Sequence, residues 1–340
     1  MLYFLLRPLL FTLDPERAHA LTFSGLNTLD RLGLAGLLGS APVAADAVQL
    51  MGLTFPNRVG IAAGLDKNAV CVDALGALGV GFVEVGTVTP RAQPGNPKPR
   101  IFRLPESSAL INRMGFPNEG MEVVAQRLAQ STFQGIRGVN IGKNASTSLT
   151  DATQDYLTCL HHLAPYADYI AINVSSPNTT GLRSLQAADQ LRPMLHALLE
   201  ARTKLLPGLQ RSLPMVVKLA PDLNDDELQA IAQLLLELSI DGVIATNTTL
   251  SRPANIGPLG AETGGLSGRP VHTLSLATVS KLRRLLGPAF PIIGVGGICS
   301  GEDAQAMRHA GADLVQLYTG LIYQGPGLVG EVTRAMRIAR

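Results

Sequence analysis

A run of small polar residues follows a predicted buried strand in the stretch YIAINVSSPNTTGL, residues 169–182. A plain turn needs one or two such residues, whereas here Asn, Ser, Ser, Pro, Asn, Thr, Thr and Gly follow one another. The excess indicates a surface that binds a ligand rich in hydrogen-bonding groups, with a hydroxyl placed to react. Ser175 and Ser176 are the candidates, and because side chains alternate along an extended chain they should point in opposite directions.

Lysines and amides also stand at the ends of other predicted strands. Lys67 in AAGLDKN and Lys218 in VKLAPD lie at strand tips, and asparagines 140, 173 and 247 lie inside strand-like runs. The general polarity of loops and the preferences of helix N-caps explain any single polar end. They do not explain lysines at strand tips or amides within strands. Buried amides need partners, which a planar heteroaromatic ligand would supply.

Two glycine-rich segments, GVGGI (294–298) and YTG (318–320), follow the last two predicted strands. Barrel enzymes often bind a phosphate at this place through backbone N–H groups. PLP, FMN and a sugar phosphate are all candidates. Lys218 could form the Schiff base of a PLP enzyme, but asparagines and threonines suit the two edges of a flavin better, and a lysine would stabilise the reduced, anionic ring.

A repeating order of strands and helices would position these residues. Eight short apolar runs without polar alternation are typical of parallel strands buried on both faces, namely RVGIAAGL, GFVEVGTV, RGVNIG, DYIAINVSS, MVVKLAP, DGVIATNT, PIIGVGGI and ADLVQLYTG. Between them lie helical patterns such as NEGMEVVAQRLAQS, DDELQAIAQLLLELS and GEDAQAMRHAG. We therefore predict an α/β fold, a (β/α)₈ TIM barrel with its site at the carboxyl ends of the strands. A doubly wound sheet is the weaker alternative, because no GxGxxG follows the first strand.

The amino terminus precedes this repeat. MLYFLLRPLLFTL is apolar, but Arg7 and Pro8 interrupt it, so it is too short to span a bilayer, and it lacks the features of a secretory signal. The following residues have helical spacing, with Asp14 as N-cap and Pro15 at the first helical position. We expect a helical extension over residues 1–40 and a barrel domain over 41–340, closed at its base by a small hairpin in VQLMGLTFPN.

The composition favours some classes of protein and argues against others. Of 340 residues, 46% are hydrophobic and 16% are charged, which favours a large core. A net charge of +2 without basic runs gives no support for nucleic-acid binding. Cys71, Cys159 and Cys299 are widely spaced, so we expect reduced thiols and neither a disulfide framework nor a metal site.

Taken together, the motifs resemble those of one family. They are AAGLDKN, GTVTPRAQPGNPKPRIFRLPE, INRMGFPNEG, NVSSPNTTGLR, VKLAPDL, TNTT, GGLSGRP, GVGGI and LYTG. In order and spacing the chain resembles dihydroorotate dehydrogenase, specifically the membrane-associated, quinone-using class 2. The resemblance implies a non-covalent FMN in each chain, oxidation of dihydroorotate to orotate in pyrimidine synthesis, and a peripheral place on the cytoplasmic side of the cell membrane.

The resemblance also implies roles for individual residues. The implied flavin site comprises Ala63, Gly64, Leu65, Asp66, Lys67, Thr87, Asn140, Asn173, Lys218, Thr246, Gly268, Gly297, Tyr318 and Thr319. The implied substrate site comprises Lys67, Asn112, Arg113, Met114, Gly115, Phe116, Asn173, Asn178, Asn247 and Thr248. The implied quinone contacts are His19, Arg103 and Tyr318.

Ser176 corresponds to the catalytic base of this class, where the soluble class has cysteine. Thr179 and Phe116 would support the path by which its proton leaves. The helical extension would lie in the membrane interface, with Arg7 reaching the headgroups and six apolar side chains entering the acyl region, namely Leu2, Phe4, Leu5, Leu9, Leu10 and Phe11.

Other interpretations remain open at this point. The extension could be no more than a packing segment. The chain could belong to the soluble, fumarate- or NAD-linked class, although Ser176 and the helices argue against this. It could also be a PLP or aldolase-type barrel that uses Lys218 covalently, or a membrane-surface binding module.

Overall fold

Eight parallel strands form a closed barrel at the centre of the protein. The computed structural model describes residues 2–39, 46–254 and 256–337. Around the barrel the strand order is β10-β12-β13-β3-β4-β7-β8-β9. The strands are β3 (Val59–Ile61), β4 (Phe82–Val88), β7 (Ile136–Ile141), β8 (Tyr169–Asn173), β9 (Met215–Leu219), β10 (Gly242–Ala245), β12 (Ile292–Val295) and β13 (Leu314–Leu317). Seven lie within one of the eight apolar runs and β7 begins one residue before its run, so the prediction of a (β/α)₈ barrel is confirmed.

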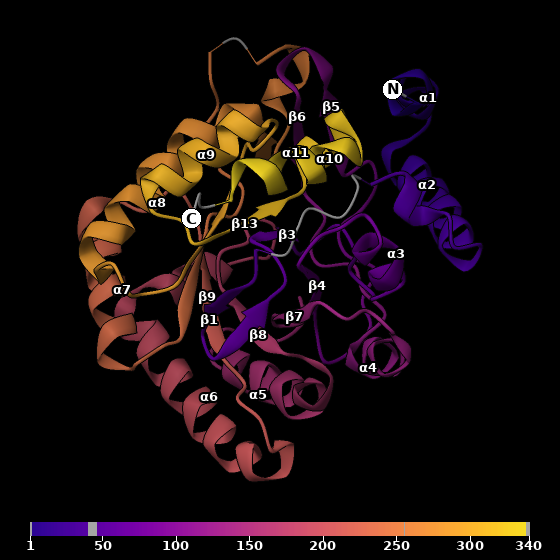
Figure 1. Cartoon of the computed structure of the whole chain (residues 1–340). Coiled ribbons are helices and arrows are strands. Elements are labelled where there is room, and N and C mark those ends of the chain that lie inside the picture. Colours follow the sequence, from indigo (N-terminus) through magenta and orange to yellow (C-terminus); the bar gives the residue numbers. More distant parts are fainter. Residues whose placement is uncertain (1, 40–45, 255, 338–340) are drawn as a thin grey trace.

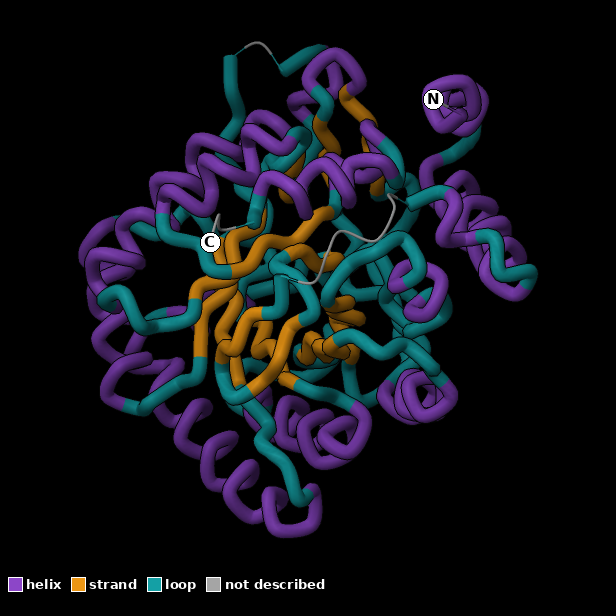
Figure 2. The backbone as a smooth tube through the Cα atoms, viewed as in Figure 1, coloured by secondary structure: helices purple, strands orange, loops and turns teal. Residues whose placement is uncertain are grey.

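Helices surround the strands, as Figure 2 shows with strands in orange and helices in purple. They are α3 (Val72–Gly76), α4 (Met121–Gln130), α5 (Ala152–Leu163), α6 (Ala188–Leu209), α7 (Asp225–Glu237), α8 (His272–Leu286), α9 (Gly301–Ala310), α10 (Thr319–Gln324) and α11 (Gly327–Ala335). Local sequence sets their ends. Asn224 and Glu227 form a capping box at the start of α7, and Gly311 ends α9 at a φ of 117°, a conformation that favours glycine.

A hairpin closes the base of the barrel, as predicted. It consists of β1 (Val48–Leu50) and β2 (Leu53–Phe55), paired antiparallel. The fully buried ring of Phe55 packs edge to face on Phe82, the first residue of β4, with 5.4 Å between ring centroids. Because Phe55, Phe82 and Tyr169 fill the amino-terminal end of the barrel, only its carboxyl-terminal end can hold a ligand.

A three-stranded antiparallel sheet lies over that carboxyl-terminal end, and the sequence analysis did not foresee it. It pairs β5 (Ile101–Leu104), β6 (Ala109–Asn112) and β11 (Gly265–Gly268) in the order β11-β6-β5. Asn112 in β6 lies opposite Gly265 in β11, although the two are far apart in the sequence. The sheet therefore joins the loop after β4 to the loop after β10.

Two helices precede the barrel, as predicted, and lie at its edge beside β5 and α3 (Figure 1). They are α1 (Leu2–Thr12), which continues through Pro8, and α2 (Pro15–Arg31), whose N-cap Asp14 accepts two backbone N–H bonds. No helix in the described ranges is long and apolar enough to cross a membrane. The expected boundary between residues 40 and 41 falls outside the residues that the structure describes.

One face of α1 docks on the barrel and the opposite face is exposed. Tyr3 donates its hydroxyl to the carbonyl of Ile322, and Arg7 donates to the carbonyl of Tyr323 at 2.8 Å. Arg7, predicted to reach the headgroups, thus has one guanidinium nitrogen bonded to the end of α10. The exposed side of α1 carries apolar side chains, among them Phe4, Leu5, Leu6 and Leu9.

An ion pair fixes α2 to the loop between β4 and β5. Arg100 donates from Nε and Nη2 to the two carboxylate oxygens of Glu16, at 2.6 and 3.1 Å, and Lys98 lies 2.8 Å from the same carboxylate. The hydrogen bond from Arg100 is the main reason that the pKa of Glu16 falls from 4.5 to about 2. Arg100 also donates to the carbonyls of Pro94 and Asn96.

This ion pair predicts acid-sensitive attachment of α2. Because the folded-state pKa is lowered, the stabilisation is fully present above about pH 4.5 and is lost as pH falls toward 2. With allowance for solvent around Lys98, we expect about 1–2 kcal/mol of local stability. Glu16→Gln should lower the hydrogen-exchange protection of α2 already at pH 6 and leave little further loss on acidification. Glu119→Gln, which removes the more exposed pair with Arg127, is the control. Unchanged protection of α2 in Glu16→Gln at pH 6 would contradict this interpretation.

Candidate active site

A cavity opens at the carboxyl-terminal end of the barrel, beneath the three-stranded sheet. The space between its lining atoms, including the solvent at its open mouth, is about 1010 Å³. Most predicted site residues line it, namely Ala63, Gly64, Lys67, Thr87, Asn112, Met114, Gly115, Phe116, Asn173, Ser176, Asn178, Lys218, Thr246, Asn247, Thr248, Gly268, Gly297, Tyr318 and Thr319. The structure thus brings side chains from distant parts of the chain to one place.

Some predicted residues do not line the cavity. Leu65 is in the hydrophobic core. Asp66 is buried, and its carboxylate accepts backbone N–H bonds from Asn68, Val70 and Cys71, so it shapes its own loop. Arg113 pairs with Glu262 at 2.7 Å and stacks over Phe102.

The proposed quinone contacts are likewise divided. Tyr318 lines the cavity and donates to the carbonyl of Gly64 at 3.1 Å, and burial raises its pKa to about 12. His19 packs against Phe23 within α2, and Arg103 donates to the carbonyls of Phe11 and Leu13. Arg103, in β5, therefore belongs to the contact between the helices and that strand, whereas His19 makes its ring contact within α2.

Asn140 acts from behind the cavity wall. Its Oδ1 accepts from Thr87 Oγ1 at 2.5 Å and from Asn173 Nδ2 at 3.2 Å, while Asn173 Nδ2 also donates to Thr87 Oγ1 at 2.8 Å. These bonds fix the orientations of Thr87 and Asn173, which do line the cavity. Satisfied buried polar networks of this kind hold their members rigid.

A buried carboxylate, Glu84 on β4, lies below this amide layer. It is fully buried and accepts from Asn140 at 2.9 Å, from the hydroxyl of Tyr169 at 2.8 Å and from the amide of Gln316 at 2.7 Å. Lys218 Nζ lies 3.8 Å from it. Burial lowers the pKa of Lys218, and Glu84 opposes that shift. Glu84 was not among the predicted site residues, although an acidic residue within the apolar run FVEVGTV is unusual and could have indicated a buried polar role.

The adjacent serines point in different directions, as expected. Ser175 is fully buried, donates to Asn173 Oδ1 at 3.0 Å and accepts from Asn247 Nδ2 at 2.9 Å. Ser176 lines the cavity, and the one partner of its Oγ among the residues that the structure describes is the backbone N–H of Asn178, at 3.2 Å. The hydroxyl of Ser176 is therefore free to donate toward a ligand, whereas that of Ser175 holds the amide side chains in place.

Lys67 supplies a positive charge to the cavity. Its Nζ donates to the carbonyl of Gly64 at 2.5 Å. Burial and the nearby charge of Arg100 lower its pKa to about 8, against the opposing effects of Glu16 and Asp66. Below about pH 8 it can therefore pair with an anionic ligand.

Seven buried side-chain polar atoms have no hydrogen-bond partner within the described part of the chain. Three of them are Gln316 Oε1, Thr248 Oγ1 and Thr179 Oγ1, and the other four are arginine Nε atoms of residues that do not line the cavity. Gln316 and Thr248 line the cavity. Because such groups are rarely left unpaired in native proteins, their presence around one cavity indicates a polar ligand. Gln316 was not among the predicted site residues.

The glycine-rich end of β12 forms a close-fitting backbone turn. Gly296 and Gly297 have φ angles of 128° and 72°, and a Cβ at these positions would lie 2.1 Å from Ser275 Oγ and 2.5 Å from His272 Cβ. Only glycine fits, so bare backbone lines the cavity. Beside it α10 begins at Thr319, where the first N–H groups of a helix have no partner inside the helix. This combination fits a phosphate group, with Thr319 and Ser267 adding hydroxyls.

Comparison with known proteins identifies the family of the chain. The family model for dihydroorotate dehydrogenase matches residues 46–338. The chain belongs to the dihydroorotate dehydrogenase family. It is 56% identical over 336 residues to dihydroorotate dehydrogenase (quinone) of Chromobacterium violaceum, covering 98% of this chain and 97% of that one. It is 54% identical over 339 residues to the protein of the same name from Ralstonia nicotianae, covering 98% of each.

A solved structure of the family has the same architecture. The crystal structure of the Eimeria tenella dihydroorotate dehydrogenase in complex with ferulenol superposes with a TM-score of 0.87 at 40% identity. The match covers 95% of this chain and 90% of that one. The resemblance inferred from the motifs is thus confirmed, and the protein is an oxidoreductase of this family.

The pairing of Glu84 with Lys218 predicts a large loss of stability when one charge is removed. Glu84→Gln should lower the free energy of unfolding by about 3 kcal/mol, because it leaves the buried ammonium without its anion. Adding Lys218→Met should restore part of the loss, since no unpaired charge remains. Denaturant unfolding of both variants, with Glu122→Gln on the exposed side of α4 as control, measures this. If Glu84→Gln had the same free energy of unfolding as the wild type, the pairing of Glu84 with Lys218 would not be important for stability.

Proposed function

We propose that this protein oxidises (S)-dihydroorotate to orotate with FMN and passes the electrons to a membrane quinone, as a step of pyrimidine synthesis. The observation that carries the proposal is the lining of one cavity by four asparagines, a lysine and a free serine hydroxyl, namely Asn112, Asn173, Asn178, Asn247, Lys67 and Ser176. The quinone-dependent names of relatives above 50% identity support it.

The chain's residues fit a non-covalent FMN. Gly268, Gly297 and Thr319 would hold the phosphate, while Thr87, Asn173, Thr246 and Lys218 would meet the ring. A bound flavin would supply the acceptor for the hydride and the means to pass both electrons on. Lys218, held at one wall by Glu84, supplies a positive charge to the region where the reduced ring carries negative charge.

The substrate is a ring of amide N–H and C=O groups with one carboxylate. Asparagine side chains carry a donor and an acceptor each, so Asn112, Asn178 and Asn247 can pair with both kinds of group. Asn178 Nδ2 already donates to Asn112 Oδ1 at 3.2 Å, which places the two amides side by side. Lys67 would oppose the carboxylate, and this attraction is strong once the cavity excludes water.

Ser176 would remove the proton from C5 of dihydroorotate while hydride leaves C6. A serine hydroxyl is a weak base, so it needs a hydrogen-bonded path by which a proton can leave. Thr179, whose buried hydroxyl lacks a partner in the described chain, and Phe116, which lines the cavity, stand where such a path is expected.

Replacement of Ser176 tests the assignment of the base. Ser176→Ala should slow flavin reduction by dihydroorotate ~10²–10⁴-fold, the usual contribution of a general base, without loss of FMN. Ser176→Cys should keep part of the rate, because a thiol can also accept the proton. Anaerobic stopped-flow absorbance gives both rates, and Ser184→Ala, which removes an exposed hydroxyl of the same loop, is the control. Reduction of Ser176→Ala within a few-fold of the wild type would remove Ser176 from the mechanism.

We also propose that α1 and α2, within residues 1–40, attach the protein to the cytoplasmic side of the cell membrane and admit the quinone to the barrel domain, 41–340. The exposed apolar face of α1 supports this, with Leu5 and Leu9 at 70% and 67% exposure, because exposed apolar clusters mark binding surfaces. A quinone would pass His19 and Arg103 on the helix side toward Tyr318 at the cavity wall.

Turnover with different acceptors tests this function. The wild type should oxidise dihydroorotate rapidly with a long-tailed quinone and slowly with fumarate or NAD. The double variant Leu5→Ser/Leu9→Ser should bind anionic lipid vesicles at least ~10-fold more weakly, given the apolar area removed, and should lose quinone turnover on vesicles. Its flavin should still be reduced at the wild-type rate.

Leu236→Ser, at an exposed apolar position on α7, is the matched control and should behave as the wild type. Faster turnover with fumarate or NAD than with quinone would overturn the choice of acceptor. Full vesicle binding by the double variant would overturn the role of α1.

A further inference from the structure

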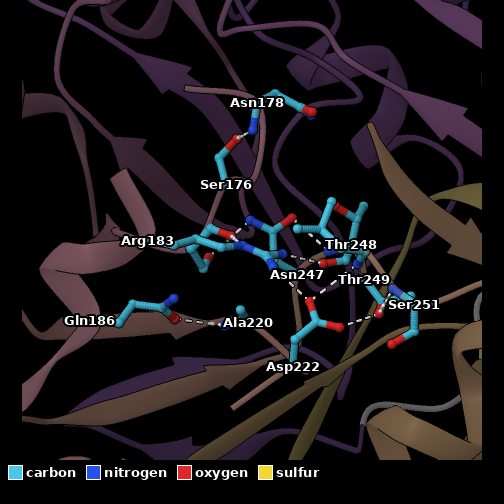
Figure 3. A network of polar contacts seen from close by, with 12 residues as sticks. Ser176, Asn178, Arg183, Gln186, Ala220, Asp222, Asn247, Thr248, Thr249 and Ser251 are labelled. Atoms are coloured by element: carbon cyan, nitrogen blue, oxygen red, sulfur yellow. Dashed lines mark hydrogen bonds and ion pairs between the residues drawn. The ribbon is translucent and has the colours of Figure 1, made fainter. Parts of the chain in front are cut away.

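One arginine outside the cavity connects three of the loops that form it. Arg183 lies in the loop after β8 and does not line the cavity. Its Nε donates to the carbonyl of Ser175 at 3.0 Å, its Nη1 to Asp222 at 2.7 Å and its Nη2 to the carbonyl of Thr248 at 2.8 Å. Figure 3 shows the guanidinium between these groups. The loops after β8, β9 and β10 are thereby held to a single planar group.

Two of these three contacts lie next to a residue proposed to meet substrate. The carbonyl of Ser175 belongs to the peptide group that leads directly into Ser176, so Arg183 sets the orientation of that peptide. The carbonyl of Thr248 follows Asn247, whose amide faces the cavity. The distance between the side chains of Ser176 and Asn247 therefore depends on the position of the Arg183 guanidinium.

Asp222 anchors the guanidinium on its other side. Its carboxylate also accepts the hydroxyl of Thr249 and, at 3.3 Å, the N–H of Leu250. The loops after β8 and β9 are also joined by a hydrogen bond from the backbone N–H of Ala220 to the side-chain oxygen of Gln186, at 2.9 Å, as Figure 3 shows. The side chains of Arg183 and Asp222 are only 20% and 21% exposed, so water competes little for these bonds.

We infer that Arg183, fixed by Asp222, is a positioning residue that aims the hydroxyl of Ser176 at the substrate. This rests on the proposed role of Ser176. A planar guanidinium makes three bonds in fixed directions, which the single ammonium of lysine cannot reproduce. Because a displacement of about 1 Å in a reacting group can cost on the order of 10²-fold in rate, loss of this geometry should slow the proton transfer more than it weakens binding.

Arg183→Lys tests the inference, with Asp222→Asn as a second variant. We expect flavin reduction to slow by roughly 10–10²-fold, while orotate affinity, measured by calorimetry on the FMN-bound protein, changes less than about three-fold. Arg192→Lys, which alters an exposed pair with Glu237, is the matched control and should do neither. In the Ser176→Ala background, Arg183→Lys should cause no further slowing, because the group that it positions is gone.

Slowing of the same factor in the Ser176→Ala background would overturn the inference, as would wild-type reduction by Arg183→Lys. In both cases the proposed function would stand. Loss of FMN or of folding in both Arg183→Lys and Asp222→Asn would make the pair structural and would also overturn the inference. If Ser176→Ala itself reduced flavin normally, the base assignment would fail, and the inference would fail with it.

Discussion

The arrangement of the site depends on a carboxylate buried inside the barrel. Glu84 has no contact with water, and an unpaired charge in such a place would be prohibitively costly. Side chains from four other strands satisfy it, namely Asn140, Tyr169, Lys218 and Gln316. In satisfying Glu84 these side chains are themselves fixed, and Lys218 and Gln316 form part of the cavity wall. The floor of the site is therefore rigid because its charges must be paired.

The rim of the site is held differently. Loops lack the regular hydrogen bonds of strands, and two arginine–carboxylate pairs outside the cavity hold these loops in position. The pair of Arg183 with Asp222 connects the loops that carry Ser176 and Asn247. The pair of Arg100 with Glu16 joins the helical extension to the loop before β5. Both arginines use the same fork to bind backbone carbonyls and a carboxylate together. The buried charge network below the cavity and the ion pairs around its mouth together hold the residues of the proposed site in place.

Much of this could be predicted from the sequence. The eight strands were recognisable because each is a short apolar run, and most site residues lie at strand ends, where a closed barrel forces them together. The three-stranded sheet was missed because β11 pairs with β6 across a long stretch of chain, which no local pattern encodes. Arg113 was assigned to the substrate site by its motif, but the chain directs it to Glu262. Glu84 and Arg183 do not line the cavity. Their partners lie on other strands and loops, so no local sequence pattern encodes these contacts.

The proposed function requires that this cavity hold a flavin beside dihydroorotate. It is tested most directly by mixing the purified protein with dihydroorotate in the absence of oxygen and of any acceptor, while recording the visible spectrum and the orotate formed. The account predicts that the two absorption bands of oxidised FMN disappear and that one orotate appears for each FMN. A protein without these bands, or bands that persist while dihydroorotate remains unchanged, would contradict it.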